Sequence, residues 1–485
     1  MKFSFVPNPV ALREIRQMVR NKFVSVGLIL YLFVQLIAVM LTVVSETDSN
    51  TGGVSLTGKG IGSDVAFTVS VILVLMTLGA IPMFTGIRMT LEKNADNMDL
   101  QFATTLRPVQ FADGKFISSI VLFMLVASSS LPFLMLAYIL RGLDLGDVLL
   151  YVGIMTVFAM PLFHVAIFIG TLGTHKAFRF ALLGTVVWVA TVVFFGFGVI
   201  TLNGFGPGFE SWDFKYMILV AVCVCFILRG ASAAQLAPPH TEGSFLLRNS
   251  LIVAWFVWGA AAAGLSLWKA ETEYIVWWFG GMCAMLNFLL FTAVSSKSGM
   301  QRRIAPHNGK RSRFNLRFLF LSCAESGVLY SLILSAITGY IMIQIAKIVE
   351  NKIDDEGIAA VLFVFCYPAA YMITMRLIWH AVLRRITNCK YVGLLALLLM
   401  LLGSVLPYLL TIGNDSANPD KWFGNMNGAF DALTSWNSGH DIMEFHMCVS
   451  AVWLTAAILL YTPYIISSFR RYRKSGKEIS AIPKT

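Results

Sequence analysis

Few side chains in this sequence could do chemistry, and the densest group of them lies near the C-terminal end. It consists of His440, Asp441, Glu444 and His446, whose side chains can all bind metal ions. On a helix His440, Asp441 and Glu444 converge only in part, and His446 points to another side. We therefore interpret the group as a polar patch at a membrane interface and predict no metal site.

A second motif has the glycine and lysine spacing of a phosphate-binding P-loop. It runs from Gly53 to Gly60 and includes Gly58 and Lys59. Gly60 replaces the Ser or Thr that would hold magnesium, so nucleotide binding is not expected there. The seven cysteines include no CxxC pair, which argues against a disulfide framework and a zinc site. We name no catalytic residue and expect no enzyme activity in this chain.

Two ionisable residues fall inside long apolar runs, where a charge is costly and is often functional. His164 either faces a polar pathway or pairs with a neighbouring helix. Glu325 either pairs with Arg317 or with an Arg of another helix, or takes part in transport or gating. Both are candidate intramembrane polar residues.

The elements that must position these residues are transmembrane helices. The 485 residues are 57% hydrophobic and only 13% charged, and apolar runs of about 20 residues, enough to cross a bilayer, recur along the chain. The predicted fold is all-α: a polytopic membrane protein of about twelve transmembrane helices with an N-terminal amphipathic interfacial helix. The predicted spans are 23–44, 66–87, 117–140, 148–172, 180–201, 216–234, 249–268, 274–296, 318–346, 357–378, 391–412 and 443–468.

The distribution of basic residues predicts the orientation of these helices. The net charge is +11, and with both termini in the cytoplasm most of the 37 Lys and Arg residues fall in cytoplasmic segments. This agrees with the positive-inside rule, so the excess charge does not indicate a nucleic-acid partner. We expect a multi-pass protein of the bacterial cytoplasmic (inner) membrane.

The segment before the first span has the pattern of an interfacial helix. Asn8 suits the N-cap and Pro9 the first helical position. Apolar side chains follow on one face and basic ones on the other, which is typical of a helix lying in the membrane interface. An ordinary basic flank that fixes topology remains the alternative. The residues that define this segment are Asn8, Pro9, Arg13, Glu14, Arg16 and Arg20.

The cytoplasmic segment after the second span, 89–116, is a candidate contact for another protein. It is unusually acidic for this side of the membrane, it carries a discontinuous apolar stripe, and Pro108 interrupts it. A solvated connector is the alternative. The candidate contact residues are Glu92, Asp96, Asp99, Thr104, Thr105, Arg107, Pro108 and Lys115.

Together these two segments resemble the permease subunits of type 2 ATP-binding-cassette (ABC) exporters. The resemblance rests on the Asn8-Pro9 helix, on Glu92, on the turn ending at Arg107-Pro108 and on Gly114-Lys115, and it covers about residues 7 to 140. It implies a separate ATPase subunit, acting as a dimer, that would hold ATP and magnesium and would contact the segment around Glu92 as a coupling helix. This chain needs no cofactor of its own. The chain departs from the family in having about twelve spans instead of six.

The predicted organisation has two six-helix modules. They are 23–235 and 249–468, with the interfacial (elbow) helix at 1–22, a linker at 236–248, an outer loop at 413–441 and a basic cytoplasmic tail at 469–485. Membrane lipids are expected partners, and a homodimer or a second permease are open alternatives for completing the pore. The alternative function is a secondary active transporter without an ATPase partner. The substrate is not determined by the sequence.

Overall fold

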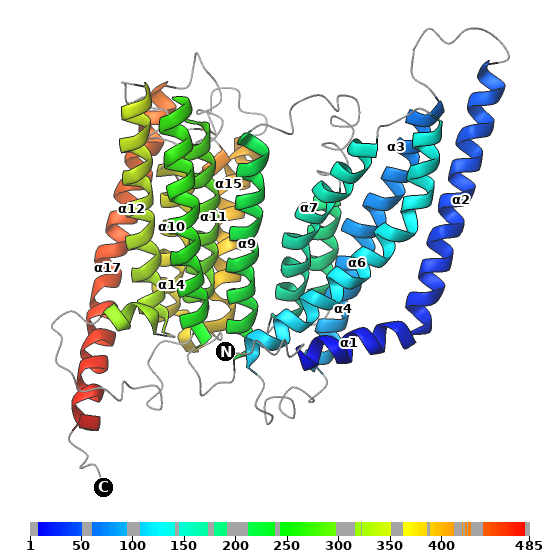
Figure 1. Cartoon of the computed structure of the whole chain (residues 1–485). Helices are drawn as coiled ribbons and strands as arrows, with labels where there is room; N and C mark the ends of the chain where they lie inside the picture. Colours follow the sequence, from blue (N-terminus) through cyan, green and yellow to red (C-terminus); the bar gives the residue numbers. More distant parts are fainter. Residues whose placement is uncertain are drawn as a thin grey trace. The chain divides into compact units, whose positions relative to one another are not determined.

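The computed structural model describes most of the chain as helices (Figure 1). The described residues are 8–50, 61–94, 107–140, 145–172, 179–191, 212–237, 243–296, 316–321, 323–350, 362–385, 389–411, 420, 422–423, 425–427 and 440–480. They form two compact units, each described here by itself. Unit 1 comprises Met1–Pro238 with Leu246–Ala254, and unit 2 comprises Pro239–Phe245 with Trp255–Thr485.

Unit 1 is built on helices that pack side by side. They are α1 (Pro9–Arg20), α2 (Lys22–Asn50), α3 (Ile61–Val74), the π-helix η1 (Leu75–Ala80), α4 (Ile81–Asn94), α6 (Pro108–Ile139), α7 (Leu145–Thr171) and α9 (Trp212–Leu236). Aromatic and aliphatic side chains, mostly from α2, α3, α6 and α7, fill a core cluster that includes Tyr31, Leu73, Phe123 and Phe163. α9 packs on both α6 and α7.

Unit 2 holds most of α10 and the helices that follow it. They are α10 (Gly243–Lys269), α11 (Glu273–Val294), the 3-10 helix η4 (Leu316–Phe320), α12 (Ala324–Glu350), the π-helix η5 (Leu362–Cys366), α14 (Tyr367–Ala381), the 3-10 helices η6 (Leu383–Arg385) and η7 (Cys389–Tyr391), α15 (Val392–Thr411) and α17 (His440–Ser480). α14 lies centrally, because it packs on α11, α15 and α17.

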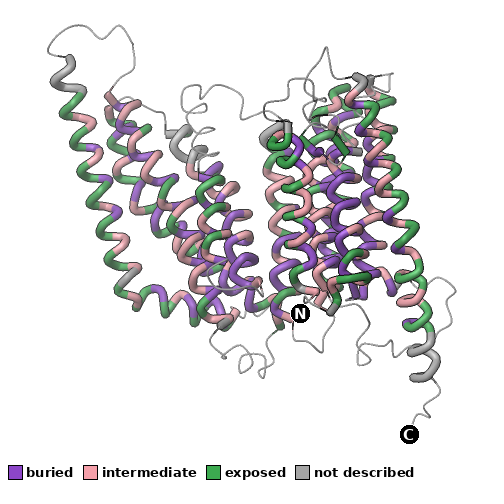
Figure 2. The backbone as a smooth tube through the Cα atoms, turned by 180° about the vertical axis from the view of Figure 1, so that it is seen from behind, coloured by how far each residue is buried: buried purple, intermediate pink, exposed green. Residues whose placement is uncertain are grey.

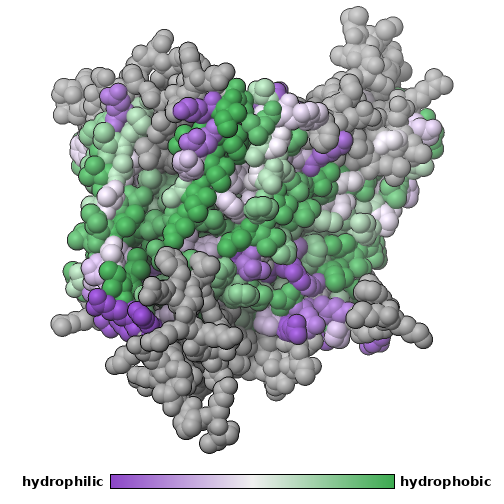
Figure 3. Space-filling model, turned by 60° about the vertical axis from the view of Figure 1, so that its left-hand side comes forward, coloured by the Kyte–Doolittle hydropathy of each residue, from purple (hydrophilic) through white to green (hydrophobic). Residues whose placement is uncertain are grey.

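The chain is an all-helical, multi-pass membrane protein. The described residues contain no strand, and ten of their helices are long and apolar enough to cross a membrane. Buried and exposed residues alternate along them (Figure 2), and many exposed side chains are large and apolar (Figure 3). In water such a surface would be a liability, whereas in lipid it is the expected surface.

The prediction of twelve spans is confirmed at ten positions. The other two are described only in part: Arg179–Thr191 is a shorter apolar helix, and the span predicted at 357–378 is described from Leu362 onward as η5 and α14. The total of twelve therefore stays a prediction.

Three predicted connectors are more helical than expected. α4 continues to Asn94 and α6 begins at Pro108, so both ends of the segment predicted as a cytoplasmic loop, 89–116, belong to helices. Pro108 starts a helix here because proline is favoured at the first helical position, and the Gln110 side chain accepts the Arg107 N–H at 3.0 Å. Helix α10 begins inside the predicted linker 236–248, and α17 continues through the predicted tail to Ser480.

Candidate functional site

The candidate site is a cluster of charged side chains where α1 meets the ends of α4 and α6. Figure 1 shows α1 lying across these ends at one side of unit 1. The Asn8 side chain accepts the Val10 N–H at 3.1 Å, as predicted for an N-cap, and its amide donates to the Gln110 carbonyl of α6 at 2.6 Å. Both contacts fix the start of α1 on α6.

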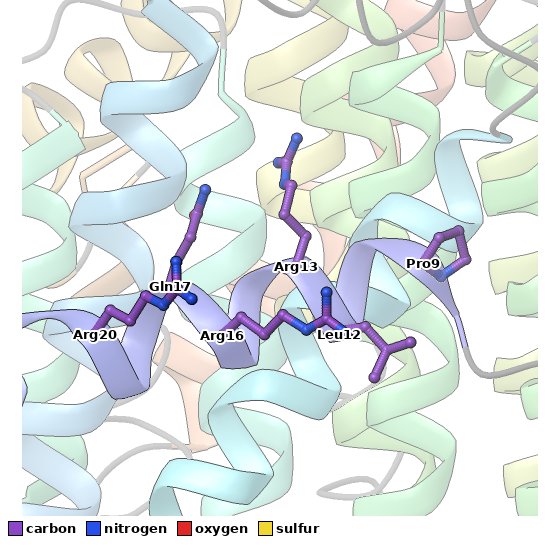
Figure 4. Close-up of a pocket in the computed structure, with 6 residues that line it drawn as sticks. All are labelled: Pro9, Leu12, Arg13, Arg16, Gln17 and Arg20. Carbon is purple, nitrogen blue, oxygen red and sulfur yellow. The ribbon is translucent and has the colours of Figure 1, made fainter.

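Helix α1 has three faces instead of the two that its sequence predicts. Val10, Ala11, Glu14 and Met18 are buried against unit 1. Leu12 and Val19 are exposed on an apolar face. The third face carries the basic residues, and together with the neighbouring Pro9 and Leu12 it lines an open groove (Figure 4); the groove residues are Pro9, Leu12, Arg13, Arg16, Gln17 and Arg20.

The buried face of α1 carries the acid Glu14, whose carboxylate is paired with two basic side chains. One carboxylate oxygen of Glu14 lies 2.9 Å from the Lys115 ammonium and the other lies 3.0 Å from the Arg88 guanidinium. Lys115 also lies 2.5 Å from the Glu92 carboxylate, and Arg88 lies 3.9 Å from the same group. The side chains of Glu14 and Lys115 are only 1% and 2% exposed. The four residues, which we call the elbow cluster, carry two positive and two negative charges and join α1, α4 and α6.

This geometry keeps Glu14 ionised. Burial by itself raises the pKa of Glu14, but Lys115, and then Arg88 and Arg13, lower it by more, so the pKa lies below its ordinary value. Removing one partner from such a buried pair leaves an uncompensated charge, which is far more costly than losing a surface ion pair. The cluster therefore couples the position of α1 to the ends of α4 and α6.

Three consecutive residues of α6 connect this cluster to the rest of unit 1. Gly114 allows the close approach of α1, since a Cβ there would lie 2.7 Å from the Val10 side chain and 3.1 Å from the Ala11 amide nitrogen. On one side of it Lys115 binds the elbow cluster. On the other side Asp113 accepts two hydrogen bonds from Arg229 of α9, at 2.5 and 2.7 Å. The run Asp113-Gly114-Lys115 thus ties α6 to α1, α4 and α9.

The structure locates the predicted contact residues unevenly. Glu92 and Lys115 belong to the elbow cluster, and Arg107 with Pro108 forms the start of α6. Asp96, Asp99, Thr104 and Thr105 lie outside the described residues. Contact with a partner protein stays a prediction for all of them, but the buried ammonium of Lys115 is engaged within unit 1.

Sequence reasoning missed three members of this network. Arg88, Asp113 and Arg229 were not among the candidate residues predicted from the sequence. A usable signal for Arg88 was its spacing of four residues from Glu92 on one helix. Asp113 stands beside Gly114-Lys115 in the sequence, but its partner Arg229 is too distant along the chain to be inferred.

The intramembrane candidates are both buried. The Nδ1 atom of His164 lies 3.1 Å from the Met160 carbonyl of its own helix, and its ring packs on Phe116 with 4.0 Å between ring centroids. Glu325 is 2% exposed in the first turn of α12. The side chain of Arg317, its predicted partner, lies outside the described residues. A transport or gating role stays a prediction for both.

Of the polar group near the C-terminal end, the side chains of His440 and Asp441 lie outside the described residues, and His446 is described. His446 is buried, with its ring nitrogens 2.6 Å from the Tyr367 hydroxyl and 2.6 Å from the Asp420 carbonyl. No group of three potential metal ligands occurs among the described residues. The P-loop-like run Gly53–Gly60 lies outside them.

Comparison with protein-family models, with curated protein sequences and with solved structures finds no match to this chain.

Proposed function

We propose that this chain is the membrane-spanning permease subunit of an ABC-type exporter that is driven by a separate ATPase. The observation that carries the proposal is the elbow cluster, in which Lys115 joins Glu14 of α1 to Glu92 of α4. These are three of the positions on which the sequence resemblance rests. The proposal includes a cytoplasmic location for this end of unit 1 and for both termini, in a bacterial inner membrane.

The proposed mechanism follows from where the cluster lies. Residues 95–106 connect the end of α4 to the start of α6, and the Lys115–Glu92 pair holds these two ends together. A force applied to that connection by an ATPase would move α4 and α6 as one body. Because Glu14 also binds Lys115, α1 would move with them. Buried ion pairs suit such a role, since they favour one specific arrangement of helices more than they add stability.

In this proposal the ATPase binds ATP and magnesium, and this chain supplies the contact surface and the pathway. Residues 89–107 would form the docking element, whereas Lys115 and Glu14 act from within unit 1. Unit 2 would complete or accompany the pathway. The proposed lipid contacts involve the apolar and basic faces of α1, on which Val19 is 71% exposed.

The test is purification of the tagged full chain from its native membrane in mild detergent. We expect a stoichiometric ATPase to co-purify, and we expect the double charge reversal Asp96→Lys with Asp99→Lys to release it. Glu271→Lys, in a predicted outer segment, is the matched control and should retain it. Purification without any ATPase, under conditions that preserve a known ABC complex, would favour the secondary transporter instead.

A further inference from the structure

A second buried charged group lies in unit 2, and the elbow cluster does not involve it. Arg376 of α14 is 0% exposed, Tyr461 of α17 is 1% exposed and Glu325 of α12 is 2% exposed. The Tyr461 hydroxyl lies beside the Arg376 guanidinium, without a hydrogen bond of good geometry, and within electrostatic range of the Glu325 carboxylate. Three helices therefore direct polar groups toward one buried place.

The hydrogen bonds of Arg376 are only partly formed. Its Nη1 donates to the carbonyl of Val294 at 2.8 Å. Val294 is the last residue of α11, where carbonyl groups lack partners within the helix and favour a cation. The guanidinium also lies over the Trp379 ring at 4.7 Å. The Nε and Nη2 atoms, in contrast, are buried and have no hydrogen-bond partner.

These two free nitrogens form the side of the guanidinium that binds a carboxylate with two parallel hydrogen bonds. The same chain shows this arrangement filled at Arg229, where Nε and Nη2 donate to the two oxygens of Asp113. At Arg376 the corresponding pair of donors is buried and unfilled. A buried guanidinium with two unused donors is costly in a membrane bundle, so the arrangement calls for an acceptor.

Glu325 is the matching acceptor. Its Oε2 atom is buried without a hydrogen-bond partner, and no ion pair joins these two described residues in this structure. α17 packs on both α12 and α14, and its Tyr461 interacts electrostatically with Glu325 of the first and Arg376 of the second. A movement of α12 against α17 is therefore the change that would bring the carboxylate to the free donors.

We propose that Arg376 is a carboxylate-binding site at the junction of α11, α12, α14 and α17, and that Glu325 occupies it in a second state of unit 2. In the state described here Arg376 donates a hydrogen bond to the end of α11 and lies over the Trp379 ring. In the second state it also binds α12, so the pair switches the position of α12. This inference is independent of the proposed ATPase partner and holds equally for a secondary transporter.

The test is a double-mutant cycle on the purified full chain, read as the apparent midpoint of thermal unfolding. The variants are Glu325→Gln, Arg376→Gln and the double substitution. We expect the double variant to lose clearly less than the sum of the two single losses, because it leaves no unpaired buried charge. Additive losses, or a neutral Glu325→Gln, would overturn the proposal.

Arg376→Lys is a second variant that keeps the proposal testable if Arg376→Gln fails to fold. It keeps the positive charge and one donor for Val294, but a lysine cannot make the two parallel bonds. We expect it to be purified as a folded protein and to show a reduced coupling to Glu325→Gln. Coupling equal to that of wild type would contradict a two-bond carboxylate site.

A titration with acetate distinguishes Glu325 from an external carboxylate. If Glu325 is the occupant, acetate leaves the midpoint of the wild-type protein unchanged and raises that of Glu325→Gln only. Stabilisation of the wild-type protein by acetate that depends on Arg376 and not on Glu325 would show that the occupant comes from outside the chain, and would overturn the assignment.

Discussion

Replacing Lys115 with methionine keeps most of the apolar side chain and removes the ammonium at the centre of the elbow cluster. Glu14, 1% exposed, would lose the contact at 2.9 Å and keep Arg88 at 3.0 Å, while Glu92 would lose its 2.5 Å contact. Breaking a buried ion pair by removing one partner costs roughly 3–5 kcal/mol. We expect about 3 kcal/mol, the lower end of that range, because Arg88 continues to compensate Glu14.

The loss should appear as local opening of α1, which the cluster holds against α4 and α6. A free-energy change of about 3 kcal/mol corresponds to somewhat more than a 100-fold change in an opening equilibrium. Hydrogen exchange measured by mass spectrometry on a peptide covering 9–20 should therefore accelerate by roughly that factor in Lys115→Met. The exchange of α12 in unit 2 serves as an internal reference.

Arg16→Met is the matched control, since it removes a charge from the exposed basic face of the same helix. Its exchange in 9–20 should stay within about 3-fold of wild type, as expected for an exposed charge without a buried partner. The double variant Glu14→Gln with Lys115→Met should exchange more slowly than Lys115→Met alone, because the buried carboxylate of Glu14, which lost Lys115, is then replaced by a neutral amide. Equal exchange in wild type and Lys115→Met would refute the claim that the cluster fixes α1.

Three further predictions concern the same network. Gly114→Ala forces a Cβ to within 2.7 Å of the Val10 side chain and should destabilise the protein by roughly 1–3 kcal/mol, seen as a lower thermal unfolding midpoint. Gly153→Ala is the control, since a Cβ there meets open space, and it should not lower the midpoint. Asp113→Asn removes one charge from the two-bond pair with Arg229, whose side chains are 27% and 39% exposed, so it should lower the midpoint by less than Lys115→Met does. The folded-state pKa of Glu14 is below its ordinary value, so the protection of 9–20 from hydrogen exchange should be complete above about pH 5 and should fall as the pH drops through the lowered pKa. Glu14→Gln should remove this pH dependence. A loss of protection on raising the pH would contradict the prediction.

Much of the fold follows from the sequence because lipid imposes a simple rule on it. A run of about 20 apolar residues without a charge has few stable alternatives to a spanning helix. The start of α1 was also predictable, because Asn8 and Pro9 occupy positions with strong local preferences. The extent of α4 and α6 was not, because the charged residues at their ends read as loop until their partners are known.

The elbow cluster shows what sequence reasoning could not reach. Glu92 and Lys115 were named as candidates, but as surface contacts, because a charge in a connector is normally solvated. In the structure the face of α1 that packs against unit 1 includes the carboxylate of Glu14 and is not a continuous apolar stripe. The pairing depends on three segments that are distant along the chain, and no local pattern encodes it.

Arg376 illustrates the same limit in unit 2. Arg376 lies just inside the end of the span predicted at 357–378 and was not among the candidate residues predicted from the sequence. The structure shows it fully buried, with its guanidinium on the Val294 carbonyl. A basic residue inside a predicted span, with the acid Glu325 inside the span that precedes it, is a signal that could have been used.

The central claim, that residues 89–107 of this chain dock a separate ATPase, is tested most directly by site-specific photo-cross-linking in intact cells. A photoreactive amino acid at position 99 should give an adduct that contains a nucleotide-binding ATPase, while the same probe at position 271, in a predicted outer segment, should not. Adducts at position 99 that contain no ATPase, with the chain correctly inserted, would contradict the account.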